Sequence, residues 1–174
     1  ILAGSLIISP ESPWKKEFSE IFQNASLAPL ADPDAIALAE TSRDVKKRLP
    51  LLNESCLLLK RQLERHPSIE RVLHPEDCPN FNQIMRPNGG YGCLLSFVLK
   101  DGLQKTKSFY NSLRVCKGPS LGTNFTLVCP YVLLAHYDEL EWAEECGVPP
   151  YLIRVSVGLE DPNTLWNKFE EALL

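Results

Sequence analysis

The sequence predicts an α+β fold in which a small, mainly antiparallel sheet packs against helices. After Pro67, short apolar runs and helical patterns follow in the order strand, strand, helix, strands, helix, strand, helix. Before Pro67 the apolar residues recur mostly at helical spacing. The chain has 174 residues, 44% of them apolar and 23% charged, which is enough to bury a sizeable core.

The first elements are expected to be a strand and a helix. Residues 2–9, LAGSLIIS, form an apolar run, and we expect it to be a strand of a longer protein rather than a signal peptide, because it has no basic leader and no Met. In residues 12–24, Ser12 suits an N-cap and Pro13 suits the first helical turn. The apolar stripe of that helix comprises Trp14, Phe18, Ile21 and Phe22.

A long helical pattern covers residues 32–67. Asp32 and Pro33 repeat the cap-then-proline start, and Pro67 ends the pattern. Because a proline inside a helix removes a backbone hydrogen bond, we expect a kink or break at Pro50. The buried stripe after it is predicted to be Leu52, Cys56, Leu59 and Leu63.

The remaining elements are assigned from the spacing of apolar residues and from the Gly and Pro residues that end helices and strands. Strands are expected at 68–75, at 93–99 with apolar residues on both faces, within 114–130, and at 151–158. Helices are expected at 101–113, at 137–147 closed by Gly147, and after an Asp161–Pro162 cap. Residues 76–92 read as a loop. The last helix should face inward with Leu165, Trp166, Phe169 and Leu173.

One strand carries an unexpected charge. In YLIRVSVGLEDP, residues 151–162, Ile153, Val155 and Val157 share one face, while Arg154 and Ser156 share the other. Arg154 could simply point into solvent, as charges on half-buried strands often do. It could also point into a cleft and bind an anion. The pattern alone leaves both interpretations open.

Six cysteines and three Asn-X-Ser/Thr sequons, at Asn24, Asn53 and Asn124, could indicate a secreted glycoprotein. However, the cysteines form no CxxC pair, and Cys56, Cys93 and Cys129 fall inside expected helix or strand, where a free thiol behaves as a small apolar group. We therefore expect reduced cysteines in a cytoplasmic protein.

Composition and motifs favour few other functions. The net charge of −4 gives no reason to expect nucleic acid as a partner, and no apolar run is long enough to cross a membrane. The three histidines lack metal-ligand spacing, so no metal site is expected. The glycines of NGGYG, residues 88–92, lack the GK[ST] of a phosphate loop, and no GxSxG motif is present.

Several stretches together resemble the C-terminal domain of the Cys/Met-metabolism enzymes that use pyridoxal 5′-phosphate (PLP), the cystathionine γ-synthase and lyase family. Ser120-Leu121-Gly122 is similar to its S-L-G-G, Cys129-Pro130 stands at its H-P, and residues 152–161 are similar to L-I-R-[LV]-S-V-G-[IL]-E-[DN]. Upstream, residues 90–102 are similar to G-G-M-L-S-F-x-L-K-G-G, and residues 64–75 to E-x-H-P-x-V-x-x-V-x-Y-P. The resemblance spans nearly the whole chain.

Departures from the family pattern refine the prediction. Thr123 replaces the second glycine of S-L-G-G, and Phe125 stands at an acidic position, which suggests the fungal γ-synthase branch. The resemblance begins just after the family's Schiff-base lysine. It implies that residues 1–49 are the tail of the PLP-binding domain with the start of a linking helix, and that residues 50–174 are the C-terminal α+β domain of a fold-type I enzyme. No cofactor-binding residue is expected in this chain, which should be inactive alone.

The resemblance also implies roles for two residues. Arg154 stands where the family's arginine holds the α-carboxylate of the amino-acid substrate, and this favours the cleft interpretation. Ser120 stands where the family's serine lies beside the reactive lysine and the substrate. The implied reaction is γ-replacement in transsulfuration and methionine metabolism, in which cysteine displaces the acyl group of an O-acyl-homoserine.

Three alternatives stay open at this point. A cystathionine β- or γ-lyase, or an O-acylhomoserine sulfhydrylase, would use the same fold. A non-catalytic domain could have kept the fold for assembly or regulation. A disulfide-linked secreted glycoprotein is the third. Family members form homo-oligomers, so a homo-oligomer is expected.

Overall fold

The computed structural model describes residues 4–25 and 29–174 and divides the chain into two compact units, residues 1–46 and 47–174. The first unit contains helices α1 (Lys15–Asn24) and α2 (Asp32–Ser42), and neither helix has a buried side chain. The expected domain boundary after residue 49 concerns a longer protein and stays a prediction.

Two expectations for the first unit need correction. No strand forms over residues 4–9, since strand hydrogen bonds need a neighbouring strand and none of the described strands pairs with this segment. Residues 2 and 3 of the expected strand lie outside the described residues. Helix α1 begins at Lys15, and the Ser12 hydroxyl accepts a hydrogen bond from the Trp14 N–H at 3.2 Å just before it.

Helix α3 (Val45–Arg65) continues through Pro50, so of the kink or break expected at this proline the break is wrong. The helical pattern is instead interrupted by a turn at residues 43–44. Pro50 lies near the start of α3 and has no N–H, so the helix loses one backbone hydrogen bond there. The hydrogen bonds of the turns that follow stabilise the helix by more than this loss. The predicted buried stripe is confirmed, because Leu52, Cys56, Leu59 and Leu63 are all at most 4% exposed.

The described strands form one five-stranded sheet of order β1-β2-β5-β4-β3. Its strands are β1 (Ile69–Leu73), β2 (Leu94–Leu99), β3 (Cys116–Lys117), β4 (Leu127–Pro130) and β5 (Ile153–Ser156). Neighbours pair antiparallel except β3 and β4, which pair parallel. The prediction of an α+β fold with a mainly antiparallel sheet is confirmed.

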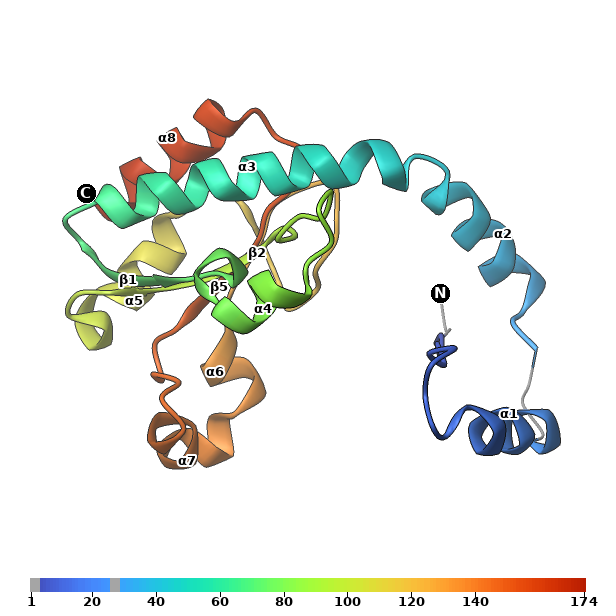
Figure 1. Cartoon of the computed structure of the whole chain (residues 1–174). Helices are drawn as coiled ribbons and strands as arrows, with labels where there is room; N and C mark the ends of the chain where they lie inside the picture. The colour runs from blue at the N-terminus through green and yellow to red at the C-terminus, as the bar shows by residue number, and fades with distance from the viewer. Residues whose placement is uncertain (1–3, 26–28) are drawn as a thin grey trace. The chain divides into compact units, whose positions relative to one another are not determined.

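The helices lie on both faces of the sheet (Figure 1). On one face α3, α5 (Gly102–Ser112) and α8 (Pro162–Leu173) cover the main core, where Phe97, Phe109 and Phe169 meet with ring centroids 5.6–6.4 Å apart. On the other face α6 (Tyr131–Ala135) and α7 (Leu140–Glu145) cover a smaller cluster of Val98, Val132, Ala143 and Leu152. Strand β5 is therefore in the middle of the sheet and has helices on both sides.

Helical turns that the sequence did not predict occupy two connections. The expected loop at 76–92 contains the 3₁₀ helix η1 (Pro75–Asp77) and α4 (Pro79–Ile84), each of which has a proline in its first turn. The short helix α6 precedes η2 (Tyr137–Glu139) and α7. The expected caps at Gly147, which has φ +81°, and at Asp161, whose carboxylate accepts from the Thr164 N–H at 2.8 Å, are confirmed.

Candidate functional site

Strand β5 separates an apolar face from a polar face, as its alternation predicts. Ile153, Val155 and Val157 are 0% exposed and belong to the main core. Arg154 is half-buried and projects from the opposite face, where its cross-strand neighbours are Ser96 on β2 and Cys129 on β4. Both neighbours are small, so they leave room for the guanidinium above the sheet.

The guanidinium of Arg154 is held by uncharged groups. Its Nη2 donates a hydrogen bond to the carbonyl oxygen of Pro119, and its central carbon lies 4.9 Å from the centroid of the Tyr131 ring. Among the described residues it forms no ion pair with a carboxylate. A cation with carbonyl and aromatic neighbours and no bound counter-charge can accept an anion.

Cys129 adjoins this cation without neutralising it. Burial raises the pKa of the Cys129 thiol, and the charge of Arg154 together with a hydrogen bond from it offsets only part of that rise. Cys129 therefore stays a neutral thiol, and the positive charge of Arg154 remains available to a ligand.

The turn that carries Ser120 lies beside Arg154. Ser120 follows Pro119, whose carbonyl oxygen Arg154 contacts. Two residues further on, the Gly122 N–H donates to the Ser156 hydroxyl at 3.0 Å, and Gly122 has φ +73°, a left-handed conformation that suits glycine. The structure thus brings the segment around Ser120 to the polar face of β5. The Ser120 side chain is exposed and has no hydrogen-bond partner among the described residues.

The segment after β5 fixes the start of β4. Glu160 accepts hydrogen bonds from the N–H of Thr126 at 2.6 Å and from its hydroxyl at 2.8 Å, and the same hydroxyl accepts from the Gly158 N–H at 3.0 Å. A Cβ on Gly158 would lie 2.5 Å from the carbonyl carbon of Phe125. The spacing of the glycine and the glutamate in S-V-G-L-E-D therefore lets both residues contact the segment Phe125–Thr126. These contacts hold the part of the chain that follows Ser120.

A second charged cluster lies at the edge of the sheet. The ammonium of Lys60, on α3, lies 2.9–3.0 Å from carboxylate oxygens of Glu64, Glu76 and Asp77. Burial alone would lower the pKa of Lys60, but the three hydrogen-bonded carboxylates raise it well above its usual value. The cation is thus fully compensated, in contrast to Arg154, and this cluster holds η1 against α3.

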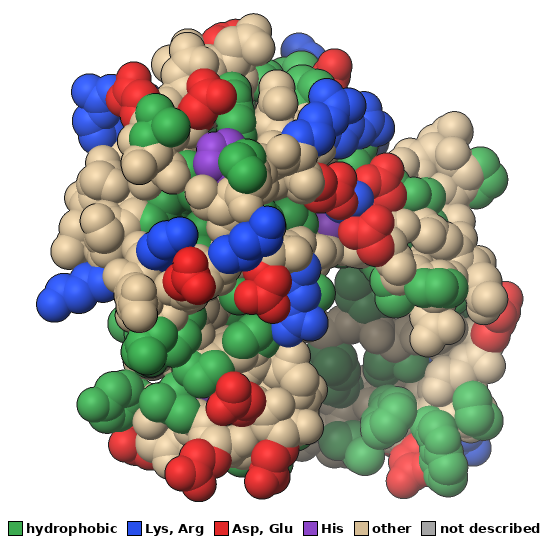
Figure 2. Space-filling model, turned by 90° about the vertical axis from the view of Figure 1, so that its left-hand side faces the viewer, with side chains coloured by type: hydrophobic (Ala, Val, Ile, Leu, Met, Phe, Trp, Pro, Cys, Tyr) green, Lys and Arg blue, Asp and Glu red, His purple; other side chains and the backbone are tan. Residues whose placement is uncertain are grey.

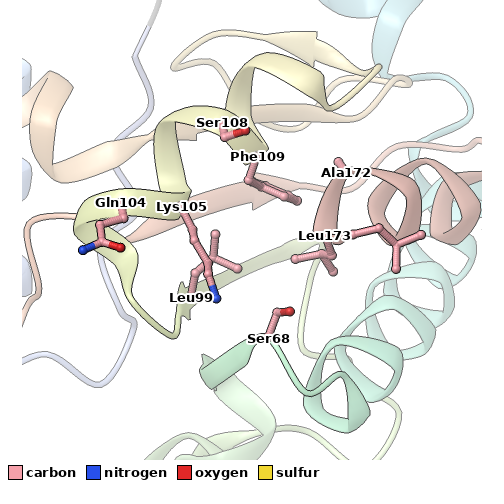
Figure 3. Close-up of a pocket in the computed structure, with 9 residues that line it drawn as sticks. Ser68, Leu99, Gln104, Lys105, Ser108, Phe109, Ala172 and Leu173 are labelled. Carbon is pink, nitrogen blue, oxygen red and sulfur yellow. The ribbon is translucent and has the colours of Figure 1, made fainter.

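A hollow of about 250 Å³ between α5 and α8 lies apart from this site (Figure 3). Its lining includes Ser68, Gln104, Lys105 and Leu173 and contains neither Arg154 nor Ser120. Lys105 is paired with Asp101 at 3.2 Å. Nothing in this hollow connects it to the residues that the sequence singled out.

The surface and the cysteines bear on the other classes of function. Figure 2 shows basic and acidic side chains intermixed on one face, with acidic ones gathered at its lower end, where α7 lies. All six cysteines are free thiols, and the amide oxygen of the half-buried sequon residue Asn53 accepts a hydrogen bond from the Gly92 N–H. Within the described ranges, no helix has the length and apolarity to cross a membrane, and no three His, Cys, Asp or Glu residues gather into a metal site.

Comparisons with known proteins agree with this geometry. The family model described as Cys/Met metabolism PLP-dependent enzyme matches residues 1–174. Cystathionine gamma-synthase of Neurospora crassa is 40% identical over 99% of this chain, which spans 28% of that protein. The Saccharomyces cerevisiae protein of the same name is 38% identical over 99% of the chain, which spans 29% of its length.

A solved structure has the same fold. Cystathionine gamma synthase from Xanthomonas oryzae pv. oryzae, in complex with cystathionine, superposes with a TM-score of 0.72 at 23% identity and covers 80% of this chain and 37% of that one. The predicted family resemblance and the predicted fungal relationship are thus confirmed. The chain belongs to the Cys/Met metabolism family of PLP-dependent enzymes.

Proposed function

We propose that this chain is the C-terminal, substrate-binding part of a PLP-dependent cystathionine γ-synthase. In the proposed reaction the Cγ–O bond of an O-acyl-homoserine breaks, the acyl group leaves as a carboxylate, and the cysteine sulfur forms a new Cγ–S bond, giving cystathionine. The names of the two fungal relatives and the match along the whole chain support this activity. Because the chain spans less than a third of those relatives, the activity is that of the longer protein.

The observation that carries the proposal is the uncompensated charge of Arg154. A planar guanidinium fits a carboxylate through two parallel hydrogen bonds. On the polar face of β5, Arg154 would bind the α-carboxylate of the amino-acid substrate and so fix the direction of its Cα–H bond. Ser120 is one residue from the Pro119 carbonyl that Arg154 contacts. It would lie beside the substrate and orient the amine of the family's reactive lysine, which moves the proton of the substrate Cα–H bond.

The residues around Arg154 fit the substrate but do not form a cofactor site. The groups that contact Arg154 are a carbonyl, an aromatic ring and a thiol, and none is a lysine. When bound, PLP supplies the electron sink that stabilises negative charge at the substrate Cα. We propose that the lysine and the phosphate-binding loop belong to a part of the protein preceding this chain, so that this chain alone is inactive.

The test uses the complete protein, including the part that precedes Ile1. Arg154→Ala removes a charge-assisted pair worth about 1.5–3 kcal/mol, and we expect kcat/KM to fall about 10- to 100-fold. Arg61→Ala, an exposed arginine on α3, is the matched control and should behave as wild type. An unchanged kcat/KM in Arg154→Ala would contradict the role assigned to this residue.

Assays with different acceptors distinguish sister reactions on the same fold. Cysteine as the preferred acceptor supports the synthase, sulfide a sulfhydrylase, and cleavage of cystathionine a lyase. A visible absorption band of the complete protein with PLP, shifted by amino-acid substrate, would exclude a purely non-catalytic domain. The six free thiols support a cytoplasmic location. Family membership supports a role in transsulfuration and methionine metabolism, and it supports a homo-oligomer.

A further inference from the structure

We infer that Tyr131 is a positioning residue that holds the Arg154 guanidinium in the plane needed to bind the substrate carboxylate. This inference rests on the proposed function, since it concerns how the same arginine works. Tyr131 follows the Cys129-Pro130 pair and belongs to none of the sequence motifs that led to the family. Its role comes from its position in the fold.

Arg154 needs such a partner because its neighbours in the sheet are short. Of its cross-strand neighbours, Ser96 has a short side chain, and Cys129 offers the guanidinium only a thiol, which is a weak hydrogen-bond partner. The Pro119 carbonyl holds one nitrogen of the guanidinium. A carbonyl oxygen and a weakly bonding thiol leave the flat face of the guanidinium without support, so a contact on that face is needed to fix the plane of the fork.

The Tyr131 ring supplies that contact. The guanidinium carbon lies 4.9 Å from the ring centroid, within the range of a cation–π interaction. Because the ring bears no charge, it attracts the guanidinium without occupying the hydrogen bonds that a carboxylate needs. An acidic residue in the same place would hold Arg154 equally well but would compete with the substrate.

Tyr131 is itself fixed by the fold. It is the first residue of α6, its N–H donates to the Leu152 carbonyl at 3.2 Å, and it packs against the cluster formed by Val98, Val132, Ala143 and Leu152. The His136 ring meets the Tyr131 ring edge-on at 5.7 Å, and His136 Nδ1 lies 2.6 Å from a carboxylate oxygen of Glu139. The ring therefore has a defined orientation before any substrate binds.

The experiment measures preference for a carboxylate in the complete, PLP-loaded protein. Binding of L-2-aminobutyrate and of 1-aminopropane, which differ by the carboxylate alone, is followed by the change in visible absorption. The affinity for L-2-aminobutyrate divided by the affinity for 1-aminopropane should fall about 2- to 30-fold in Tyr131→Leu. This range corresponds to the loss of one cation–π contact. Tyr131→Phe, which keeps the ring, should retain the wild-type ratio. So should Tyr137→Leu, a matched change of an exposed tyrosine nearby.

The outcomes separate this inference from the proposed function. If Arg154→Ala lowers the ratio but Tyr131→Leu does not, the positioning role is wrong and the proposed function stands. If Tyr131→Phe loses as much as Tyr131→Leu, the ring is not the determinant and the inference also fails. If Arg154→Ala keeps the wild-type ratio, the proposed function fails first. Should Tyr131→Leu be poorly folded by circular dichroism, Tyr131→Trp replaces it and must retain the preference.

Discussion

The two faces of the sheet are built from the same strands by different interactions. The face that packs against α3, α5 and α8 is held by burial of apolar side chains, three of which, Ile153, Val155 and Val157, are 0% exposed. The face that carries Arg154 has a smaller apolar cluster under α6 and α7 and, beside it, directed contacts, among them the hydrogen bond from Gly122 to Ser156 and the ring of Tyr131. Burial is non-directional, whereas each of these contacts depends on the geometry of one partner.

This difference determines what each face can do. A closely packed apolar face gives stability but presents no group to a ligand. The polar face buries a smaller apolar cluster, and it keeps a cation without a carboxylate partner among the described residues, next to the turn that carries Ser120. We therefore expect substitutions on the first face to change the free energy of unfolding, and substitutions on the second to change mainly ligand binding.

The largest effect on stability is expected from the apolar face of β5. Ile153→Ala should lower the free energy of unfolding by about 2–5 kcal/mol, since it removes buried methylene groups and leaves a cavity. Denaturant unfolding followed by circular dichroism measures the change. Ile84→Ala is the matched control, because Ile84 is 81% exposed on α4, and it should change stability by less than about 0.5 kcal/mol. Equal losses in the two variants would contradict the division between the faces.

A smaller effect is expected from the polar face of the same strand. Ser156→Ala removes the acceptor for the Gly122 N–H and should lower the free energy of unfolding by about 0.5–1.5 kcal/mol. The turn around Ser120 would lose its tie to β5, so hydrogen exchange of the Gly122 amide should become faster. Ser112→Ala, an exposed serine that bonds only its own helix, should leave that amide unchanged. Unchanged Gly122 exchange in Ser156→Ala would show that this bond does not hold the turn.

The apolar face could be predicted from the sequence because burial follows periodicity. The period of two in β5 and the helical stripe of α3 each follow from which residues face the core. The break expected at Pro50 was wrong because it was inferred from one residue and not from a periodic pattern. Whether a proline is tolerated depends on its position within a helix, and the helix boundary is set by residues 43–44 rather than by any strong signal at Pro50 itself.

The polar face could be predicted only in part. Alternation placed Arg154 opposite the core, and the family resemblance assigned it a carboxylate. The partners that hold it were not predictable, because Pro119 and Tyr131 lie 35 and 23 positions away and meet it only through the order of β4 and β5. Helix α6, which starts at Tyr131, was itself missed, since a run of five residues is too short to show helical periodicity.

The smallest effect is expected at the sheet edge, where a buried polar group lacks the partners that the Arg154 face provides. His74, which follows β1, is 7% exposed; its Nδ1 accepts from the Glu76 N–H at 3.2 Å, and its Nε2 has no partner among the described residues. Burial and the charge of Lys60 lower its pKa below the ordinary 6.5, and the opposing carboxylates of Glu76, Asp77 and Glu64 only partly offset this.

A histidine with a lowered folded-state pKa destabilises the fold in acid. Below pH 6.5 the unfolded chain binds a proton at His74 that the folded chain resists, so the free energy of unfolding should fall as the pH falls from about 7.5 to about 5. His74→Asn keeps an acceptor for Glu76 but cannot titrate, and it should make this decline shallower. If the decline is equally steep in both proteins, the carboxylates around Lys60 account for it, and the unpaired nitrogen at the sheet edge has no measurable cost.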